Sequence, residues 1–281
     1  MNLKHLTFIP SLLGFALLAF NASISLAETP VYTFAVVPQF KPAQLHQDWD
    51  PVLDRISRET GVKLKLTLAP TIPKSAAELN KAIPDFTYTD PYQALMAMKE
   101  RGYLPMLRST KPLNGIVVVR KDSDIKKIQD LDGKIIGFPS PNSFGASLYI
   151  RALLSAEKIK FTPRYLNNHN LVYKHVSLGH VAAGGSVNSA LNEESPEMRA
   201  QLTVLYQTPD VASHPILAHP RVPANIRKSV MNSLLGMQQD SEGRNMLKEI
   251  RMPSLADADY QRDYAPLDKL NIQQFIVSDG E

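Results

Sequence analysis

The pattern of apolar and polar positions changes its period several times along the chain. Between residues 43 and 60 the apolar side chains recur at steps of three and four, the spacing of one helical face, and Gly61 follows as a typical C-terminal stop. Residues 62–68 then alternate apolar with polar, which is the period of a half-buried strand. Before the helix, residues 32–37 form a mostly apolar run that Pro38 ends. These segments predict a strand, a helix and a second strand in succession.

The same alternation continues through the rest of the chain. Further strands are predicted over 85–89, 115–120, 134–138, 164–166, 181–183 and 202–206, and the segment 214–220 is predicted to be extended. Further helices are predicted over 75–83, 91–102, 143–155 and 223–237, and the remainder is predicted to be helical and polar. This order favours an α/β fold with mostly parallel sheets and helices on both faces.

The charged run 121–124 indicates a break between two α/β units. We predict two lobes, the second inserted in the first. The first is expected to span 28–116 and 212–281, and the second 117–211.

Composition excludes several classes of protein. The 281 residues are 44% hydrophobic and carry a formal charge of +4, from 31 Lys and Arg against 27 Asp and Glu. A disordered chain would have fewer apolar residues and a larger net charge. The chain has no cysteine, which excludes a disulfide framework and a cysteine-ligated metal centre. The basic residues are mixed with acids, so a nucleic-acid partner is not expected.

The first residues have the pattern of an export signal. Lys4 and His5 precede a mostly apolar run over 6–20, and small residues stand at Ser25 and Ala27. This arrangement predicts signal-peptide cleavage after Ala27 and export to the periplasm. An uncleaved N-terminal anchor is the alternative, although the run is short for a membrane span of about 20 residues. No cysteine follows the predicted cut, so a lipid anchor is not expected.

Open α/β sheets bind ligands beyond the carboxyl ends of their strands, so the loops at those ends are candidates. The loop 139–147 follows a predicted strand and opens a predicted helix. Asn142 or Ser143 is suited to cap that helix, and its first backbone N–H groups would face an incoming anion. The hydroxyls of Ser140 and Ser143 add neutral donors. The loop therefore predicts an oxyanion site.

No basic residue supports this loop: none lies between Lys134 and Arg151. We therefore expect dipoles and hydrogen bonds, more than an ion pair, to hold the anion. Ordinary helix capping without any ligand is the alternative. The loop is not a Walker P-loop, because the Gly-Lys-Ser/Thr ending is missing.

Other loops add polar residues to the same candidate site. Tyr88 and Thr89 come at a strand end, although Tyr88 is equally suited to the core and Asp90 to capping the next helix. Gln39 follows the first strand, and Ser186 lies in the loop after the strand at 181–183.

The histidines argue only weakly for a metal. No His-x-His, His-Glu-x-x-His or acid-plus-His cluster is present, and His175 and His180, five apart on a helix, share a face poorly. No metal and no cofactor are expected. His169 follows a strand end and is a better ligand candidate, with a satisfied loop histidine as the alternative. Nucleophile-elbow and dinucleotide motifs are missing, so we do not predict an enzyme.

Eight short motifs spread over the chain carry a family resemblance. They are 34–39 (FAVVPQ), 49–53 (WDPVL), 60–62 (TGV), 85–92 (DFTYTDPY), 113–119 (LNGIVVV), 130–134 (DLDGK), 141–143 (PNS) and 169–173 (HNLVY). With these motifs the chain resembles the periplasmic phosphate/phosphite/phosphonate-binding proteins of ABC importers, the phosphonate-binding branch of the type 2 periplasmic binding fold. The resemblance implies two lobes, joined by two crossing strands, that close on the ligand. It also implies that the Pro-Asn-Ser loop and the His169 loop bind the ligand.

Three places depart from the family pattern. The segment 181–186 carries only Ser186 where a pocket acid or amide is common. Phe144 stands where a small hydroxyl residue often follows Asn-Ser, and Asp90 stands where Asn often precedes Pro91. A carboxylate at Asp90 would repel an anion unless the ligand is protonated or carries an amine.

We therefore predict a monomeric periplasmic solute-binding protein that captures a phosphate, phosphite or phosphonate and delivers it to the membrane permease of an ABC importer. A periplasmic module that signals to a membrane kinase, and a secreted enzyme on the same fold, are the alternatives. The residues expected to bind the ligand are Ser140, Asn142, Ser143, Tyr88, Thr89, His169, Gln39 and Ser186.

Overall fold

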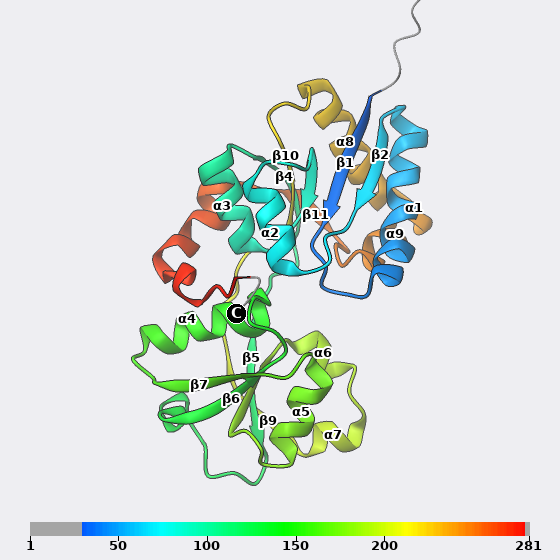
Figure 1. Ribbon diagram of the computed structural model, residues 1–281. Helices are drawn as coiled ribbons and strands as arrows, with labels where there is room; N and C mark the ends of the chain where they lie inside the picture. Colours follow the sequence, from blue (N-terminus) through cyan, green and yellow to red (C-terminus); the bar gives the residue numbers. More distant parts are fainter. Residues whose placement is uncertain (1–29, 279–281) are drawn as a thin grey trace, which may run out of the picture.

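The computed structural model describes residues 30–278, which form two sheets with helices on both faces (Figure 1). One sheet has six strands in the order β11-β4-β10-β3-β1-β2, and the other has five in the order β7-β6-β8-β5-β9. We call the six-stranded sheet with its helices the first lobe, and the five-stranded sheet with its helices the second lobe. The predicted two-lobed α/β fold is confirmed. The predicted signal peptide, residues 1–27, lies outside the described residues.

The strands, helices and short turns divide between the two lobes. The first lobe contains β1 (Val31–Val36), α1 (Pro42–Thr60), β2 (Lys63–Thr67), α2 (Ile72–Asn80), β3 (Phe86–Tyr88), α3 (Pro91–Arg101), β4 (Leu104–Ser109), β10 (Pro215–Ala218), α8 (Ala224–Gly236), η3 (Met237–Gln239), α9 (Ser241–Glu249), β11 (Leu255–Asp257), η4 (Tyr260–Tyr264) and η5 (Ala265–Leu270). The second lobe contains β5 (Ile116–Arg120), η1 (Ile128–Leu131), β6 (Lys134–Phe138), η2 (Phe144–Leu148), α4 (Tyr149–Ala156), β7 (Phe161–Tyr165), α5 (His169–Ser177), β8 (Ala183–Ser186), α6 (Asn188–Asn192), α7 (Pro196–Ala200) and β9 (Leu202–Gln207). A last short turn, η6 (Ile272–Phe275), packs against α4.

Both sheets are mixed, where the sequence predicted mostly parallel ones. β1 pairs in parallel with β2 and β3, and β6 pairs in parallel with β7 and β8. β10 runs antiparallel to β3 and β4, and β5 runs antiparallel to β8 and β9. β5 and β10 each enter their sheet directly from the other lobe.

The chain passes between the lobes twice, and the two passages pair with each other. Leu113 and Val211 form an antiparallel bridge whose two backbone hydrogen bonds are both 2.9 Å long. Next to it, Gly115 donates its backbone N–H to the Thr208 hydroxyl at 2.8 Å, and Thr208 donates its own to the Gly115 carbonyl at 2.9 Å. A Cβ atom on Gly115 would lie 2.2 Å from the carbonyl oxygen of Gly145. The crossing therefore presses closely on the turn that opens α4.

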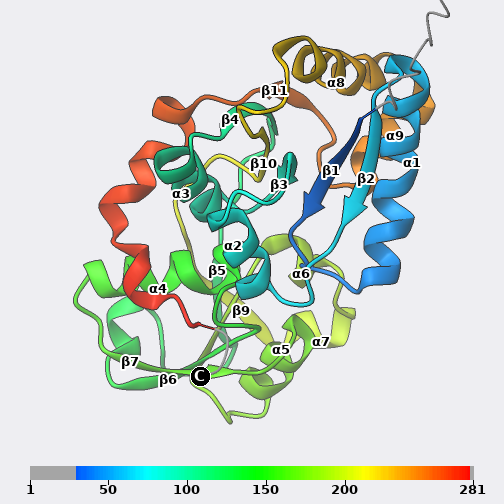
Figure 2. The same cartoon turned by 45° about the horizontal axis from the view of Figure 1, so that its top comes forward.

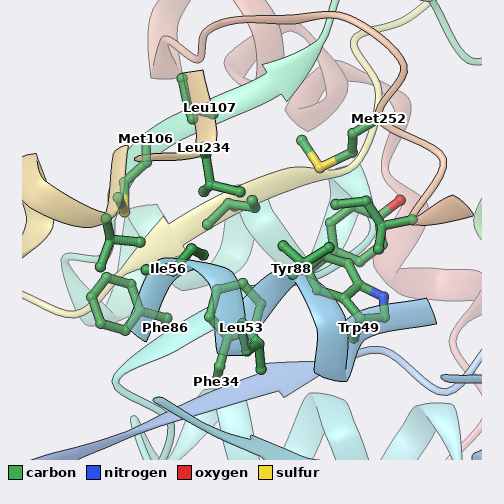
Figure 3. Close-up of a cluster of buried hydrophobic side chains, with 14 of the residues drawn as sticks. Phe34, Trp49, Leu53, Ile56, Phe86, Tyr88, Met106, Leu107, Leu234 and Met252 are labelled. Atoms are coloured by element: carbon green, nitrogen blue, oxygen red, sulfur yellow. The ribbon is translucent and has the colours of Figure 1, made fainter. Parts of the chain in front are cut away.

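The main core of the first lobe lies between α1 and the sheet (Figure 3). The apolar face that predicted this helix is buried as expected: Leu45, Trp49, Val52, Leu53 and Ile56. Trp49 packs against Phe34 of β1 and Tyr88 of β3, with ring centroids 5.3 and 5.0 Å apart. The other face of the sheet is covered by α3 and the turns η4 and η5. Figure 2 shows α1 and α9 on one side of β1 and β2, and α2 and α3 on the other.

Some local predictions were wrong or incomplete. The strands β4 and β11 have no equivalent in the predicted set, and the stretch after residue 237 contains β11 rather than helix alone. α2 begins at Ile72, earlier than predicted, because Thr71 caps it by accepting from Lys74 N–H at 3.2 Å. Asp48 of α1 is buried and pairs with Arg251 at 2.7 Å, an ion pair that the helical pattern did not predict.

Candidate functional site

The first-lobe residues of the predicted site lie at the carboxyl ends of β1 and β3. The two strand ends are joined, because Val37 donates its backbone N–H to the Tyr88 carbonyl at 3.0 Å. Thr89, which is 2% exposed, donates its N–H to the Pro215 carbonyl at 3.3 Å. Gln39 is exposed, and its Nε2 lies 2.7 Å from Nε2 of His214. The fold thus brings Gln39, Tyr88 and Thr89 to one edge of the sheet, together with His214.

His214 is the group at this edge that was not among the predicted site residues. Burial lowers the pKa of its imidazole to about 4, so the ring is neutral near pH 7. An amide nitrogen only donates, so its contact with Gln39 requires the lone pair on Nε2 and the proton on Nδ1. The ring also stacks on Tyr88, with centroids 5.4 Å apart. The signal that could have identified it is a histidine directly before β10, where the chain returns to the first lobe.

Tyr88 lies with its ring in the core. The residue is 6% exposed and packs against Trp49 (Figure 3). It also packs against His214. Burial raises the pKa of its phenol well above the usual range, so it stays protonated. This position matches the packing alternative for the ring, and a contact between its hydroxyl and a ligand stays a prediction.

Asp90 caps α3 rather than pointing at the other lobe. Its Oδ1 accepts the backbone N–H groups of Tyr92 and Gln93, both at 3.0 Å, and the residue is buried. Burial raises the pKa of the carboxyl to about 6, against the lowering effect of the two N–H donors. Its charge therefore faces the positive end of a helix, which weakens the repulsion that the sequence suggested.

In the second lobe, the predicted anion loop connects β6 to the helical segment that continues into α4. The segment starts with a wide turn: both Ser147 and Leu148 donate their N–H groups to the Ser143 carbonyl at 3.0 Å. Ser143 holds the capping position, but its side chain makes no capping hydrogen bond. Its hydroxyl is therefore not used for capping, and donation from this hydroxyl and from the first N–H groups of the turn to an anion stays a prediction. Ser140, partly exposed, lies just after β6.

Asn142 is engaged elsewhere. Its amide nitrogen donates to the Val277 carbonyl at 2.7 Å, and its amide oxygen accepts the Val277 N–H at 3.0 Å. It does not cap the helix, contrary to one of the two capping options that the sequence offered. Both ends of its side chain fix the loop to the C-terminal segment, and a direct contact with a ligand stays a prediction.

The other two second-lobe residues are brought into direct contact. Nδ1 of His169 lies 2.7 Å from the hydroxyl oxygen of Ser186, which also forms a short hydrogen bond with the Tyr173 hydroxyl. Ser186 is fully buried, whereas His169 is partly exposed at the start of α5. Burial lowers the pKa of His169, which favours its neutral form. Ser186 therefore holds the ring through Nδ1, and Nε2 is the ring nitrogen that this contact does not use. Tyr173 was not predicted, although its place one turn after His169 on a helix was a usable signal.

Two further findings concern metals and cavities. His180 lies beyond the end of α5 and its ring is 5.2 Å from that of His175, so the two are closer than their predicted places on one helix suggested. Among residues 30–278, no group of three or more His, Cys, Asp or Glu side chains is placed to hold a metal ion.

A cavity of about 350 Å³ lies beside the crossing, lined by Arg108, Asp263 and neighbours, and includes none of the predicted site residues.

The candidate residues therefore form two groups, one on each lobe. Gln39, Thr89 and His214 belong to the first, and the Ser143 turn and His169 to the second. Figure 1 shows the arrowheads of β1 and β2 directed toward the second lobe. No helix in the part of the chain from 30 to 278 is long and apolar enough to cross a membrane.

Comparison with protein families decides the assignment. The family model described as "ABC transporter, phosphonate, periplasmic substrate-binding protein" matches residues 34–264. The chain belongs to this family. The resemblance drawn from the short motifs is confirmed, and with it the function of a periplasmic substrate-binding component of an ABC transporter.

Solved structures show the same fold. A protein of Xanthomonas citri bound to chloride has a TM-score of 0.76 and 16% identity, over 87% of this chain and 98% of that one. PhnD1 from Prochlorococcus marinus in complex with methylphosphonate has a TM-score of 0.73 and 13% identity, over 87% and 98% of the two chains. A binding-protein component of an ABC phosphonate transporter from Pseudomonas aeruginosa has a TM-score of 0.69 and 17% identity, over 88% of each chain. No curated protein matches the sequence.

In this periplasmic substrate-binding protein the family match includes all the candidate residues named above. It ends at residue 264, before the segment that contacts Asn142. The predicted anion loop therefore has a contact with a segment outside the matched region.

Proposed function

We propose that this protein captures a phosphorus oxyanion of the phosphonate type between its lobes and presents it to the membrane permease of an ABC importer. The observation that carries the proposal is the start of the α4 segment, where Ser143 holds the capping position and leaves its hydroxyl unused for capping. A helix start of this kind is a site for an anion. Family membership supports the phosphonate class, and the related PhnD1 is known in complex with methylphosphonate.

The second lobe supplies most of the oxyanion contacts in this proposal. The first N–H groups of the Ser143 turn and the hydroxyls of Ser140 and Ser143 donate to the oxygens. His169, held by Ser186, presents Nε2 from the neighbouring loop. All these groups are neutral, and hydrogen bonds from neutral donors to a buried oxyanion are strong enough to select for it. Asn142 acts by fixing the loop to Val277.

The first lobe completes the site from the other side. Gln39 and Thr89 lie at the carboxyl edge of its sheet, and His214 orients the Gln39 amide. A ligand held on the second lobe would meet these groups when the lobes approach. The paired passages at Leu113 and Val211 would act as the hinge between lobes 28–116 plus 212–281 and 117–211. Hinge closure of this type is a common way to enclose a small ligand.

The remaining parts of the proposal concern the whole protein. The signal peptide is cleaved after Ala27, and the mature protein acts in the periplasm as a monomer. It binds its ligand without chemical conversion, since the family is one of transport proteins. The family description names a transporter component and gives no support to signalling through a kinase.

Calorimetric titration of the mature protein tests the proposal. We expect saturable one-to-one binding of methylphosphonate, and weaker or no binding of sulfate. The protein has one tryptophan, Trp49, which packs on Tyr88 near the first-lobe edge, so a change in its fluorescence provides an independent signal. No binding of methylphosphonate, phosphite or phosphate by either method would contradict the proposal.

A further inference from the structure

Arg151 lies directly behind the anion loop and is 4% exposed. Its Nη2 donates to the carbonyl of Pro141, inside the loop, at 2.5 Å, and to the carbonyl of Phe275 at 2.9 Å. Its Nη1 donates to the Tyr165 hydroxyl at 3.0 Å. One guanidinium thus connects the loop, the edge of the second sheet and the C-terminal segment.

No acid neutralises this cation within the described part of the chain. Between residues 30 and 278, no carboxylate lies within ion-pair distance of Arg151, and its buried Nε has no hydrogen-bond partner. Its partners are carbonyls, a hydroxyl and two aromatic rings, with the guanidinium carbon 5.7 Å from the Tyr165 ring centroid and 5.5 Å from that of Phe275. A buried charge without a counter-ion is costly in the empty protein. An anion bound at the neighbouring loop would supply the missing negative charge and offset this cost.

The C-terminal segment covers the guanidinium and is attached at both ends. On the first lobe, the Tyr92 hydroxyl of α3 donates to the side chain of Gln273 at 2.8 Å. On the second lobe, Val277 exchanges two hydrogen bonds with Asn142. Figure 1 shows this segment, in red, running from the first lobe to α4. Residues 273–277 therefore form a strap over Arg151 and the base of the loop.

We propose that Arg151 is a positioning residue that supplies the unpaired positive charge for the bound oxyanion, and that the strap 273–277 keeps it in place. This rests on the proposed function, since it assigns a role toward the same ligand. It adds a nearby positive charge to the expectation that dipoles and hydrogen bonds, more than an ion pair, hold the anion. The charge acts through the loop, because the guanidinium binds the Pro141 carbonyl rather than facing the ligand.

Charge-removing and charge-keeping variants test the role of Arg151. Arg151→Gln removes the cation and keeps an amide donor for the Pro141 carbonyl, whereas Arg151→Lys keeps a cation. We expect the first to weaken methylphosphonate binding about tenfold, and the second to keep most of the wild-type affinity. Arg199→Gln is the matched control, because it removes an exposed positive charge from the same lobe. It should leave the affinity within about twofold of wild type.

A second variant tests the strap with the charge intact. Phe275→Ala removes the ring that covers the guanidinium and should weaken binding severalfold. Melting of each variant without ligand shows whether it is folded. Wild-type affinity in Arg151→Gln, or equal losses in Arg151→Gln and Arg151→Lys, would overturn the role of the charge, and wild-type affinity in Phe275→Ala would overturn that of the strap. If the wild type binds no phosphorus oxyanion, the proposed function itself fails, which is a distinguishable result.

Discussion

Ser186 and His169 come from different elements, and the hydroxyl oxygen of Ser186 lies 2.7 Å from Nδ1 of His169. The serine ends β8 and is fully buried, whereas the histidine starts α5 and is partly exposed. The Tyr173 hydroxyl forms a second hydrogen bond with the same Ser186 oxygen. A buried hydroxyl with two partners fixes the ring of His169 and thereby the direction of its Nε2.

Ser186→Ala is expected to weaken methylphosphonate binding by about 1–2 kcal/mol, because the His169 ring loses the group that orients it. It should also lower the free energy of unfolding by about 1–3 kcal/mol, since the buried Tyr173 hydroxyl loses its partner. Calorimetry and urea unfolding measure the two effects. Ser177→Ala, at the other end of α5, is the control and should leave the affinity unchanged. Wild-type affinity in Ser186→Ala would remove this pair from the site.

Ser143→Ala separates binding from folding. Its hydroxyl makes no capping bond, so the free energy of unfolding should stay within about 0.5 kcal/mol of wild type. The loss of a donor to a charged ligand should weaken binding by about 1–3 kcal/mol. Ser195→Ala is the opposite control: Ser195 caps α7 by accepting from Met198 N–H at 3.2 Å. It should lose about 1 kcal/mol of stability and no affinity. An unchanged affinity in Ser143→Ala would exclude its hydroxyl from the site.

Two buried groups at the first-lobe edge should give opposite pH dependences of stability. The pKa of His214 is lowered to about 4, so between pH 6.5 and 4 the unfolded chain binds a proton that the folded chain does not. As the pH decreases over this range, the free energy of unfolding therefore decreases as well, by up to about 3 kcal/mol from this group. The pKa of Asp90 is raised to about 6, so the folded chain takes up a proton first. That stabilisation is complete below the unfolded pKa of 3.8 and is lost as pH rises through 6.

Variants separate these two contributions. His214→Gln removes the first, so stability should fall less than in wild type as pH falls from 7 to 4. Asp90→Asn removes the second and keeps a capping side chain, so stability should fall more steeply than in wild type over the same range. Urea unfolding at several pH values measures the slopes. Parallel curves for the three proteins would show that neither group has the environment that the structure gives it.

Gly115→Ala tests the contact between the crossing and the anion loop. The new Cβ would lie 2.2 Å from the Gly145 carbonyl, closer than such contacts allow, so either the crossing or the loop must move. We expect a loss of more than about 2 kcal/mol in the free energy of unfolding, together with weaker ligand binding. Gly236→Ala is the matched control. It lies in α8 with open space around its Cβ position, and alanine there should be neutral or stabilising by about 0.5–1 kcal/mol. Equal stability of the two variants would contradict the close approach at Gly115.

Local patterns were enough to predict much of the first lobe. α1 followed from the spacing of its apolar face, and α3 from Asp90 before Pro91, because these signals act within one or two turns. β4 escaped prediction because it contains Pro105 and Arg108 and has no clear alternation; its burial comes from pairing with β10 and β11. Strand partners of that kind are distant in sequence and leave little local trace.

In the candidate site too, some features follow from local sequence and others depend on contacts between distant residues. Ser143 was found because a helix start is a local feature. The attachment of its loop to the strap depends instead on a contact between Asn142 and Val277, 135 residues apart in sequence. In the sequence, Arg151 was notable only as the first basic residue after the predicted anion loop. Its burial behind that loop follows from the packing of η6 on α4.

A crystal structure of the mature protein with methylphosphonate tests the central claim most directly. We predict that the phosphonate oxygens accept hydrogen bonds from the Ser143 hydroxyl and the first N–H groups of its turn, with His169 beside them. Gln39 and Thr89 should then close the site from the first lobe. A ligand bound to one lobe alone, away from the Ser143 turn, or in the cavity lined by Arg108 and Asp263, would contradict this account.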